Sequence, residues 1–147
     1  MENKKIIKVA VNTFVLKDNK ILLGKRKGTV GAGTYCVPGG HLEYAELANE
    51  GAIRELKEET GLVAKTMDFV NIANTILSAV DGSHYIHINF LVKAFDGEVK
   101  LMEPERCEGW DWFDMDDLPS NLFAPHKYLI EEGLIKGKEF FDFRDLR

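Results

Sequence analysis

The segment AELANEGAIRELKEET, from Ala45 to Thr60, constrains the fold of this 147-residue chain more than any other stretch. Its small and apolar residues recur with the period of an α-helix, and Gly61 follows in the position of a helix C-cap. On a helical wheel that starts at Leu47, one arc of about 180° holds Ala48, Gly51, Ala52 and Leu56. The segment therefore predicts an amphipathic helix with one face packed on the protein.

The other apolar segments are mostly typical of strands. β-branched or alternating runs occupy residues 6–17, 21–28, 64–80, 84–95 and 107–114, with turn signals at KDNK (17–20) and DGS (81–83). A turn or short helix is expected over residues 115–119 and a second long helix over 124–137. Because strands and helices mix without strict βαβ alternation, the predicted fold class is α/β, with helices packed on a mixed sheet in one domain over residues 1–147.

Composition and charge exclude several function classes. A net charge of −5 argues against a general nucleic-acid binder, which would need a basic face. Cys36 and Cys107 form no CxxC pair, so we expect two reduced thiols in a cytoplasmic protein rather than a zinc site or a disulfide framework. No run is apolar enough for a membrane span, and the start MENKKIIKVAV has no secretion-signal cleavage site. The expected partner is a small molecule, not nucleic acid or a membrane.

Glutamates lie on the apolar arc of the predicted helix. Glu55 falls about 80° and Glu59 about 120° from Leu47, inside the arc, and Glu58 lies at its edge. Clustered carboxylates on a packed face repel one another and must protonate or find a cation. Oxygen ligands of this kind suit Mg²⁺ or Mn²⁺, so the pattern favours a metal site over the alternative, a solvated acidic helix end paired with nearby Lys and Arg.

The tripeptide Pro38-Gly39-Gly40 precedes this helix. Two glycines after a proline give a backbone that can approach a ligand closely, and a carbonyl there can join a metal site. An ordinary loop is the alternative interpretation. The tripeptide gains weight only from its position before the glutamates.

The spacing of these residues resembles the signature of the Nudix hydrolases. That signature is Gly, five residues, Glu, seven residues, then Arg-Glu-apolar-x-Glu-Glu-x-Gly-apolar. Here Gly40 is followed by HLEYA, Glu46 by LANEGAI, and RELKEETGL runs from Arg54 to Leu62. The pieces ILLGKRKG, VGAG, PGGHLE, HYIHINFLV and EPERCEGWDWF also resemble MutT-related members that remove diphosphate from nucleoside triphosphates. The C-terminal segment departs more from them.

The resemblance implies an α/β/α sandwich whose loop-helix-loop Nudix box binds Mg²⁺. Carried over by position, Glu55 and Glu59 would be the main metal ligands, Glu58 a third ligand or the residue that orients the metal water, and the Gly39 carbonyl a further ligand. Glu46 and Arg54 would brace the box. The family often adds an acid before a Trp-containing strand, for which we expect Glu105, with Glu103 as the second choice.

The reaction implied is attack of a metal-activated water on the β-phosphorus of a nucleoside triphosphate, giving monophosphate and pyrophosphate. Lys25 or Arg26 is expected to bind a phosphate, and His41 either to donate a hydrogen bond to it or to be structural. Trp110 and Trp112 share a strand face and are expected in the core, with base stacking as the alternative.

The substrate and the catalytic role stay open at this stage. The substrate alternatives are ADP-ribose or another nucleoside diphosphate derivative, and the functional alternative is a nucleotide sensor without catalysis. His84 and His87 lie three apart on a strand and are predicted to face opposite sides, so they do not form a metal pair. The aromatic segment EFFDF, residues 139–143, is expected to dock on the body or to form a homodimer contact.

Overall fold

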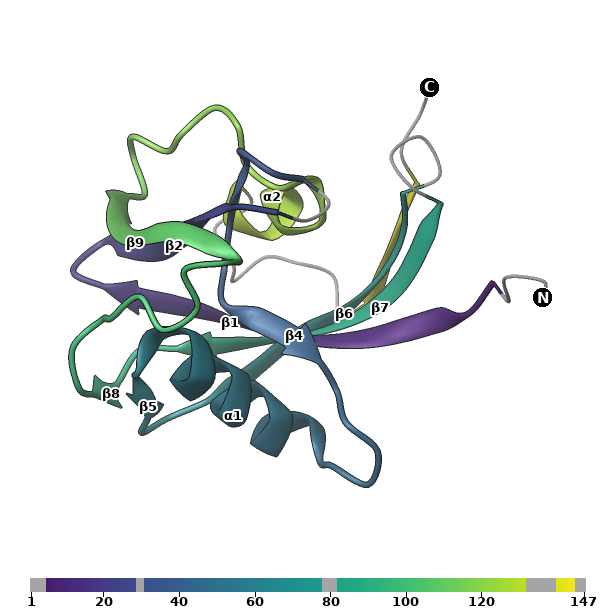
Figure 1. The fold of residues 1–147 in the computed structure, drawn as a ribbon, viewed down its shortest axis with the longest axis horizontal. Helices are drawn as coiled ribbons and strands as arrows, with labels where there is room; N and C mark the ends of the chain where they lie inside the picture. The colour runs from purple at the N-terminus through teal and green to yellow at the C-terminus, as the bar shows by residue number, and fades with distance from the viewer. Residues whose placement is uncertain (1–4, 29–30, 78–81, 132–139, 145–147) are drawn as a thin grey trace.

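The computed structural model describes residues 5–28, 31–77, 82–131 and 140–144 (Figure 1). Two helices and ten strands follow one another in this part of the chain. Their order is β1 (Ile7–Lys17), β2 (Lys20–Arg26), β3 (Tyr35–Cys36), β4 (Gly39–His41), α1 (Ala48–Thr60), β5 (Val63–Ala64), β6 (Asp68–Leu77), β7 (Ser83–Val92), β8 (Phe95–Asp96), β9 (Cys107–Asp114), α2 (Ala124–Glu131) and β10 (Phe140–Arg144).

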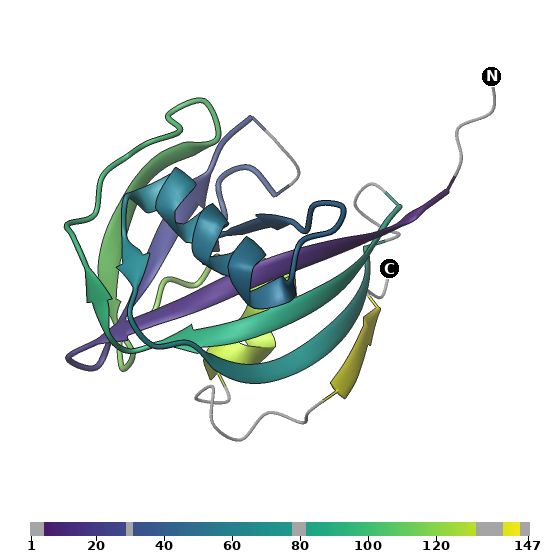
Figure 2. The same cartoon turned by 90° about the horizontal axis from the view of Figure 1, so that it is seen from below.

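Strand β1 connects the two halves of the main sheet. The sheet has the order β10-β6-β7-β1-β2-β3, with β4 also paired to β1 and β9 also paired to β2. β1 runs parallel to β7 from Ile7 to Val15, and its last residues pair antiparallel with β2. β10 is parallel to β6, and the other pairs are antiparallel. The predicted mixed sheet is therefore confirmed, and its long strands curve as Figure 2 shows.

The two helices cover opposite faces of the sheet (Figure 1). Successive side chains of a strand point to opposite sides, so β1 can contact both helices. Phe14 of β1 is buried with Leu129 and Ile130 of α2, whereas the next residue, Val15, is buried with Leu56 of α1. Each fully buried side chain of this size contributes about 1.5–3 kcal/mol of transfer free energy. The alternation along β1 thus builds both layers of the expected α/β/α sandwich.

Most predicted element positions are confirmed, with shifted ends. The turn after β1 has Asp18 and Asn19 at positive φ, as a tight hairpin turn requires. The strand predicted over residues 64–80 is two strands, β5 and β6, as far as residue 77, and residues 78–80 lie outside the described residues. The strand predicted over 84–95 ends earlier as β7, with β8 after it. Strand β9 has the predicted bounds. β4 was not predicted as a strand, because its two glycines resembled a loop.

The predicted start of the first helix at Ala45 is wrong. Ala45 has φ 61°, in the left-handed region, and α1 begins at Ala48. Glu46 therefore lies in the loop before the helix and not on it. The predicted end is confirmed: Gly61 has φ 79° and donates its N–H to the Lys57 carbonyl oxygen.

The C-terminal elements agree with the sequence as far as they are described. α2 covers the first part of the predicted 124–137 helix, and the remainder lies outside the described residues, as does the start of the DGS turn. Phe140–Arg144 form an edge strand on β6, which agrees with docking of EFFDF on the body. Among the described helices, none has the length and hydropathy needed to cross a membrane.

Candidate active site

The site begins where β4 and α1 meet. β4 pairs with β1 so that Gly39 lies opposite Asn12 and Gly40 opposite Val11. A Cβ atom on Gly39 would overlap the Asn12 side chain and the Val11 carbonyl, and one on Gly40 would overlap the carboxylate of Glu55. Neither glycine has positive φ. Space, rather than backbone freedom, therefore requires glycine here, and it allows Glu55 to lie directly against the backbone.

Glu59 is the most enclosed carboxylate of α1. Its Oε1 accepts a hydrogen bond from the Gly39 N–H at 3.2 Å. Burial, followed by the neighbouring charge of Glu55, raises the pKa of Glu59 well above its ordinary value. The prediction that the glutamates of this helix turn toward the protein is confirmed for Glu55 and Glu59, which are partly buried, while Glu58 at the edge of the arc is exposed.

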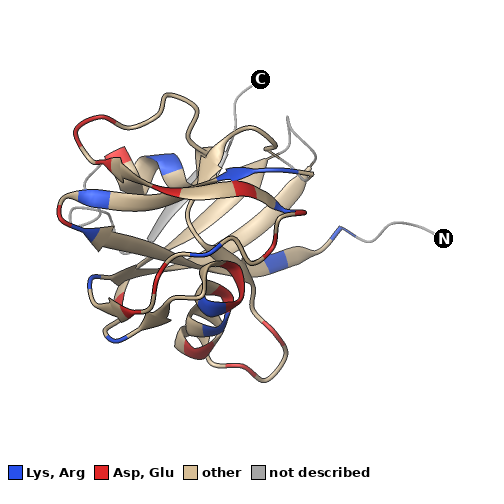
Figure 3. Cartoon of the chain, turned by 60° about the vertical axis from the view of Figure 1, so that its left-hand side comes forward, with Lys and Arg blue, Asp and Glu red and all other residues tan. Residues whose placement is uncertain are grey.

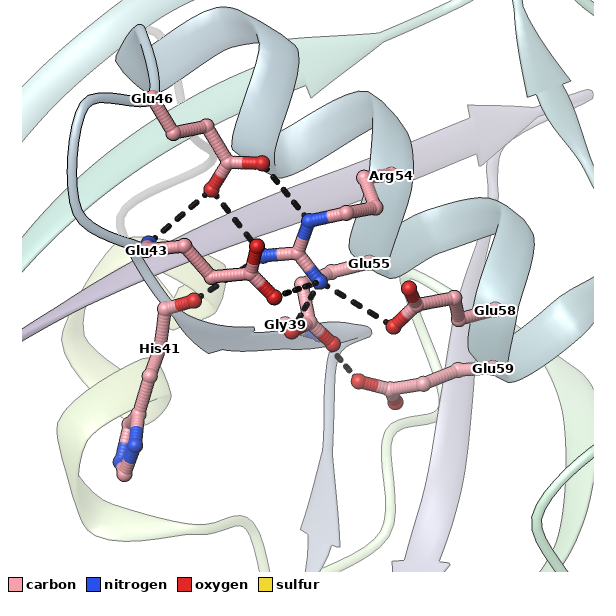
Figure 4. A network of polar contacts seen from close by, with 8 residues as sticks. All are labelled: Gly39, His41, Glu43, Glu46, Arg54, Glu55, Glu58 and Glu59. Atoms are coloured by element: carbon pink, nitrogen blue, oxygen red, sulfur yellow. Dashed lines mark hydrogen bonds and ion pairs between the residues drawn. The ribbon is translucent and has the colours of Figure 1, made fainter.

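Arg54 holds the carboxylates around this junction together (Figure 4). Its guanidinium donates two hydrogen bonds to Glu46, at 2.7 and 3.1 Å. It also donates to Glu55 at 2.9 Å, to Glu58 at 3.1 Å and to the His41 carbonyl at 3.1 Å. Hydrogen bonds from Arg54 and from the Glu43 N–H lower the pKa of Glu46. The two-point pair with Glu46 ties the loop to the helix, which is the bracing expected from the sequence.

The acid outside the helix that joins this group is Glu103. It lines the same cavity as Glu55 and Glu59, and burial raises its pKa despite the opposing effect of Arg106. Glu105 is exposed and lies outside that cavity. A turn, in which the Arg106 N–H donates to the Glu103 carbonyl, separates the two acids. Only Glu103, the second choice in the prediction from the sequence, therefore lies with the cluster.

A cavity of about 700 Å³ extends from this acidic junction across the sheet. Acidic positions run along α1 and the loop before it, as Figure 3 shows. The same cavity is also lined by basic side chains, namely Lys8, Lys25, Arg26 and Arg106. A polyanionic ligand with a bound cation therefore finds charges of both signs within one cavity.

The basic and loop residues predicted to contact substrate all line this cavity. Lys25 lies 3.7 Å from Glu108 in an exposed ion pair. The guanidinium of Arg26 stacks over the ring of Phe123 at 4.0 Å. His41 shares a hydrogen bond of 2.8 Å between its Nε2 and the Tyr85 hydroxyl. All of them therefore share one cavity with Glu55 and Glu59, and Arg26 and His41 also contact the rings of Phe123 and Tyr85.

The far end of the cavity is lined by rings that the sequence did not single out as ligand contacts. They belong to Tyr85 and His87 of β7, Phe123 before α2, and His126 in α2. Phe123 and His126 meet edge to face with ring centroids 5.1 Å apart. These residues come from elements far apart in sequence and share no motif spacing, so no local signal could have grouped them.

The tryptophans and the remaining histidine are largely structural. Trp112 stacks on Phe95 with centroids 5.8 Å apart, in the core as predicted. Trp110 packs against Gly24 but also reaches the cavity wall. His84 bonds to Asn74, while His87 bonds to Asn12 and Thr75, which confirms that the two histidines face opposite sides of β7.

The donors of the acidic junction fit a divalent cation. Within the described ranges, no three His, Cys, Asp or Glu side chains already converge as a ligand group, and Glu55 and Glu58 are both hydrogen-bonded to Arg54. The carboxylates of Glu55 and Glu59 are nevertheless adjacent, and close packing against Gly40 brings backbone to the same point. All these donors are oxygens, which Mg²⁺ and Mn²⁺ prefer.

Comparison with known proteins gives this arrangement a family. The family model described as NUDIX domain matches residues 7–133. An ADP-ribose pyrophosphatase from Methanocaldococcus jannaschii is 36% identical over 124 residues, which cover 84% of this chain and 71% of that protein. An oxidized purine nucleoside triphosphate hydrolase from Mus musculus is 30% identical over 136 residues, covering 90% of this chain and 84% of the relative.

Solved structures agree with the sequence relatives. The crystal structure of a MutT NUDIX hydrolase from Burkholderia pseudomallei superimposes with a TM-score of 0.81 at 32% identity, covering 86% of this chain and 97% of that one. The predicted resemblance and the predicted fold are both confirmed. The chain belongs to the Nudix family and is a MutT-like Nudix hydrolase, an enzyme that acts on pyrophosphate bonds of nucleotide derivatives.

Proposed function

We propose that this enzyme hydrolyses nucleoside triphosphates to the monophosphate and pyrophosphate, using Mg²⁺ or Mn²⁺. The observation that carries the proposal is the position of Glu59, an enclosed carboxylate beside Glu55 in a cavity that is also lined by Lys25 and Arg26. A cluster of acids supports cation binding, and Lys25 and Arg26 beside it support binding of a phosphate chain. The mouse relative, named for nucleoside triphosphate hydrolysis, supports the substrate class.

The metal-holding residues are Glu55 and Glu59, with Glu58 and the Gly39 carbonyl as further oxygen donors. A bound Mg²⁺ would neutralise the charge of the phosphate chain and make an attacking water more acidic. To hold it, Glu55 and Glu58 would offer carboxylate oxygens that are not used by their hydrogen bonds with Arg54. Glu46 retains Arg54 through its two hydrogen bonds, so the loop stays attached to the helix while this happens.

The proton of the attacking water needs a carboxylate acceptor close to the metal-holding group. Glu58 and Glu103 both lie near that group, and their charges and those of Glu55 act on one another. We place Glu103 in the role that the sequence analysis assigned to Glu105, because Glu103 is the one that lines the cavity. Clustered acids titrate together, so the group as a whole is assigned the proton.

The substrate phosphates are assigned to the basic wall. Lys25 and Arg26 offer charged N–H donors, and His41 offers an imidazole held by Tyr85. The unpaired thiols of Cys36 and Cys107 support action in a reducing compartment such as the cytoplasm. Burial raises the pKa of the Cys36 thiol to about 11, so it is not a nucleophile at neutral pH.

ADP-ribose is a second candidate substrate. The relative from Methanocaldococcus jannaschii is named for it and is 36% identical. Hydrolysis of ADP-ribose uses the same acids and yields AMP and ribose 5-phosphate, so the two substrates are distinguished by products and not by the metal site. A non-catalytic sensor is less favoured, because every acid of the signature is present in the sequence.

The test is product analysis on a panel of nucleoside triphosphates and ADP-ribose, in Mg²⁺ and in EDTA. Wild-type protein should release pyrophosphate and monophosphate only with metal, and Glu59→Gln should lose this activity. Glu50→Gln is the matched control, because Glu50 is an exposed acid on the same helix. If only ADP-ribose is hydrolysed, the proposed triphosphate substrate is wrong and ADP-ribose takes its place. If none of the compounds is hydrolysed, the proposal that the protein is an enzyme is overturned.

A further inference from the structure

The ring-lined end of the cavity contains two buried histidines with different hydrogen bonding. His87 is 6% and His126 3% exposed, and both line the cavity. Both rings are neutral near neutral pH: burial lowers the pKa of His87 to about 4 and that of His126 well below its ordinary value. A neutral imidazole has one donor and one acceptor nitrogen, so the partners of each ring decide what it offers a ligand.

His87 has both nitrogens engaged within the protein. Its Nδ1 lies 2.8 Å from the Asn12 Nδ2, which can only donate. The proton of the neutral ring is therefore on Nε2, where it is 3.1 Å from the Thr75 hydroxyl. With both positions used, His87 offers no hydrogen bond to a bound molecule.

His126 differs because only one of its nitrogens is used. Its Nδ1 accepts the backbone N–H of Val37 at 3.2 Å, which places the ring proton on Nε2. In the described part of the chain, Nε2 has no hydrogen-bond partner. Among the described residues, Asn71 Nδ2 is the fully buried side-chain atom that lacks a partner, and His126 Nε2 is not such an atom. Because His126 lines the cavity, its Nε2 is accessible from there. His126 thus presents an N–H donor whose tautomer is held by the backbone.

The surroundings of this donor suit a planar ring. The rings of Phe123 and His126 pack edge to face, Arg26 stacks over Phe123, and Pro125 and Leu77 add apolar surface to the lining of the same cavity. The phosphate chain of a nucleotide is drawn to the acidic and basic end. The base is the part of a nucleotide that an aromatic, weakly polar end accommodates best.

We infer that His126 is a base-reading residue: its Nε2–H donates a hydrogen bond to an acceptor atom, a ring nitrogen or a carbonyl oxygen, on the edge of the nucleotide base. This assignment rests on the proposed nucleotide hydrolase function and adds the residue that senses the base. The same position offers no acceptor, so a base edge that presents a donor there is disfavoured. One such hydrogen bond, left unmade, costs about tenfold in affinity.

The experiment compares binding of AMP, GMP, CMP and UMP with that of ribose 5-phosphate, by calorimetry on the full chain. His126→Asn keeps an acceptor for the Val37 N–H but removes the distal donor. The monophosphate that binds best should lose about tenfold in affinity, while ribose 5-phosphate, which has no base, binds unchanged. His84→Gln is the control, because His84 bonds to Asn74 and is not among the residues that line the cavity, and it should leave the ranking of the bases unchanged.

A second readout is the ¹⁵N NMR spectrum of the imidazole rings. Wild-type protein should show His126 as the neutral Nε2–H tautomer, with a shift of Nε2 on addition of the preferred monophosphate. A proton on Nδ1, or equal loss of affinity for ribose 5-phosphate and the monophosphates in His126→Asn, would overturn the assignment. So would wild-type binding that does not distinguish any monophosphate from ribose 5-phosphate.

Failure of this assignment is separable from failure of the proposed function. Triphosphate hydrolysis by the wild type tests the proposed function independently of His126. A protein that hydrolyses triphosphates but whose base ranking survives His126→Asn keeps the function and loses the base reader. A protein that hydrolyses only ADP-ribose loses the proposed substrate, and the binding comparison with AMP still decides the role of His126.

Discussion

The two ends of the cavity are built in opposite ways. At the acidic end, Glu55, Glu58 and Glu59 come from one helix, and Arg54 of that helix supplies the compensating charge. At the ring-lined end, His87 and His126 come from distant elements; His87 is hydrogen-bonded to Asn12 and Thr75, and His126 accepts only the Val37 N–H. The acidic end gathers carboxylates around one arginine, whereas the ring-lined end consists of aromatic and neutral imidazole rings, with Lys8 and Arg26 over the rings of Tyr85 and Phe123. The first arrangement suits a cation and phosphates, and the second suits a neutral ring.

The largest expected effect comes from the acidic end. Glu59→Gln removes a metal-holding carboxylate, so kcat/KM for the best triphosphate should fall about 1000-fold. The same change relieves repulsion with Glu55, so the melting temperature should not fall. Steady-state kinetics and thermal denaturation measure the two quantities. A variant that is both inactive and clearly less stable would show that Glu59 is a structural residue.

Substitution of Arg54 tests whether the surrounding glutamates depend on its guanidinium for stability. Arg54→Ala leaves Glu46, Glu55 and Glu58 without their common donor and should lower the free energy of unfolding by about 1–3 kcal/mol. Arg54→Lys keeps the charge but not the two-point geometry, so it should recover only part of the loss. Urea unfolding of the three proteins checks this. Equal stability of all three would mean that the network is not stabilising.

The ring-lined end should respond to acid. Both histidines have a folded-state pKa below the ordinary value, so the unfolded chain takes up their protons first as pH falls. Stability should be complete above about pH 6.5 and should fall toward pH 4, by about 1.4 kcal/mol per pH unit for each histidine. His87→Gln should flatten this slope. Urea unfolding at a series of pH values measures it, and an unchanged slope in the variant would exclude His87 as a cause.

The smallest expected effect is in the loop that enters α1. Ala45 has φ 61°, where an L-residue other than glycine is strained. Ala45→Gly should therefore raise the free energy of unfolding by about 0.5–1 kcal/mol and leave activity unchanged. Thermal denaturation detects a change of this size. A loss of stability would indicate that the gain in unfolded-state freedom outweighs the relieved strain.

The contrast between the ends also explains what could be predicted from the sequence. The acidic end lies within one continuous stretch with a helical period, so the direction of Glu55 and Glu59 follows from their spacing. The ring-lined end depends on which strands become neighbours, and no local pattern brings His126 to Val37. Glu103 and Glu105 have the same chemistry in one turn, and only the path of the backbone separates them. β4 was not predicted because glycine is required there by close contacts with Asn12 and Glu55, and such tertiary contacts leave no local sequence pattern.

The parallel pairing of β1 with β7 leads us to expect a particular order of folding. The hairpin of β1 and β2 closes over a few residues, whereas Ile7 must pair with His84 across about half of the chain. During synthesis the hairpin can form early, but one edge of β1 stays unpaired until β7 has left the ribosome. Closing that long loop is entropically costly, so it is the expected slow step of folding. Until then the exposed edge of β1 is the part of the nascent chain most open to aggregation or to a chaperone.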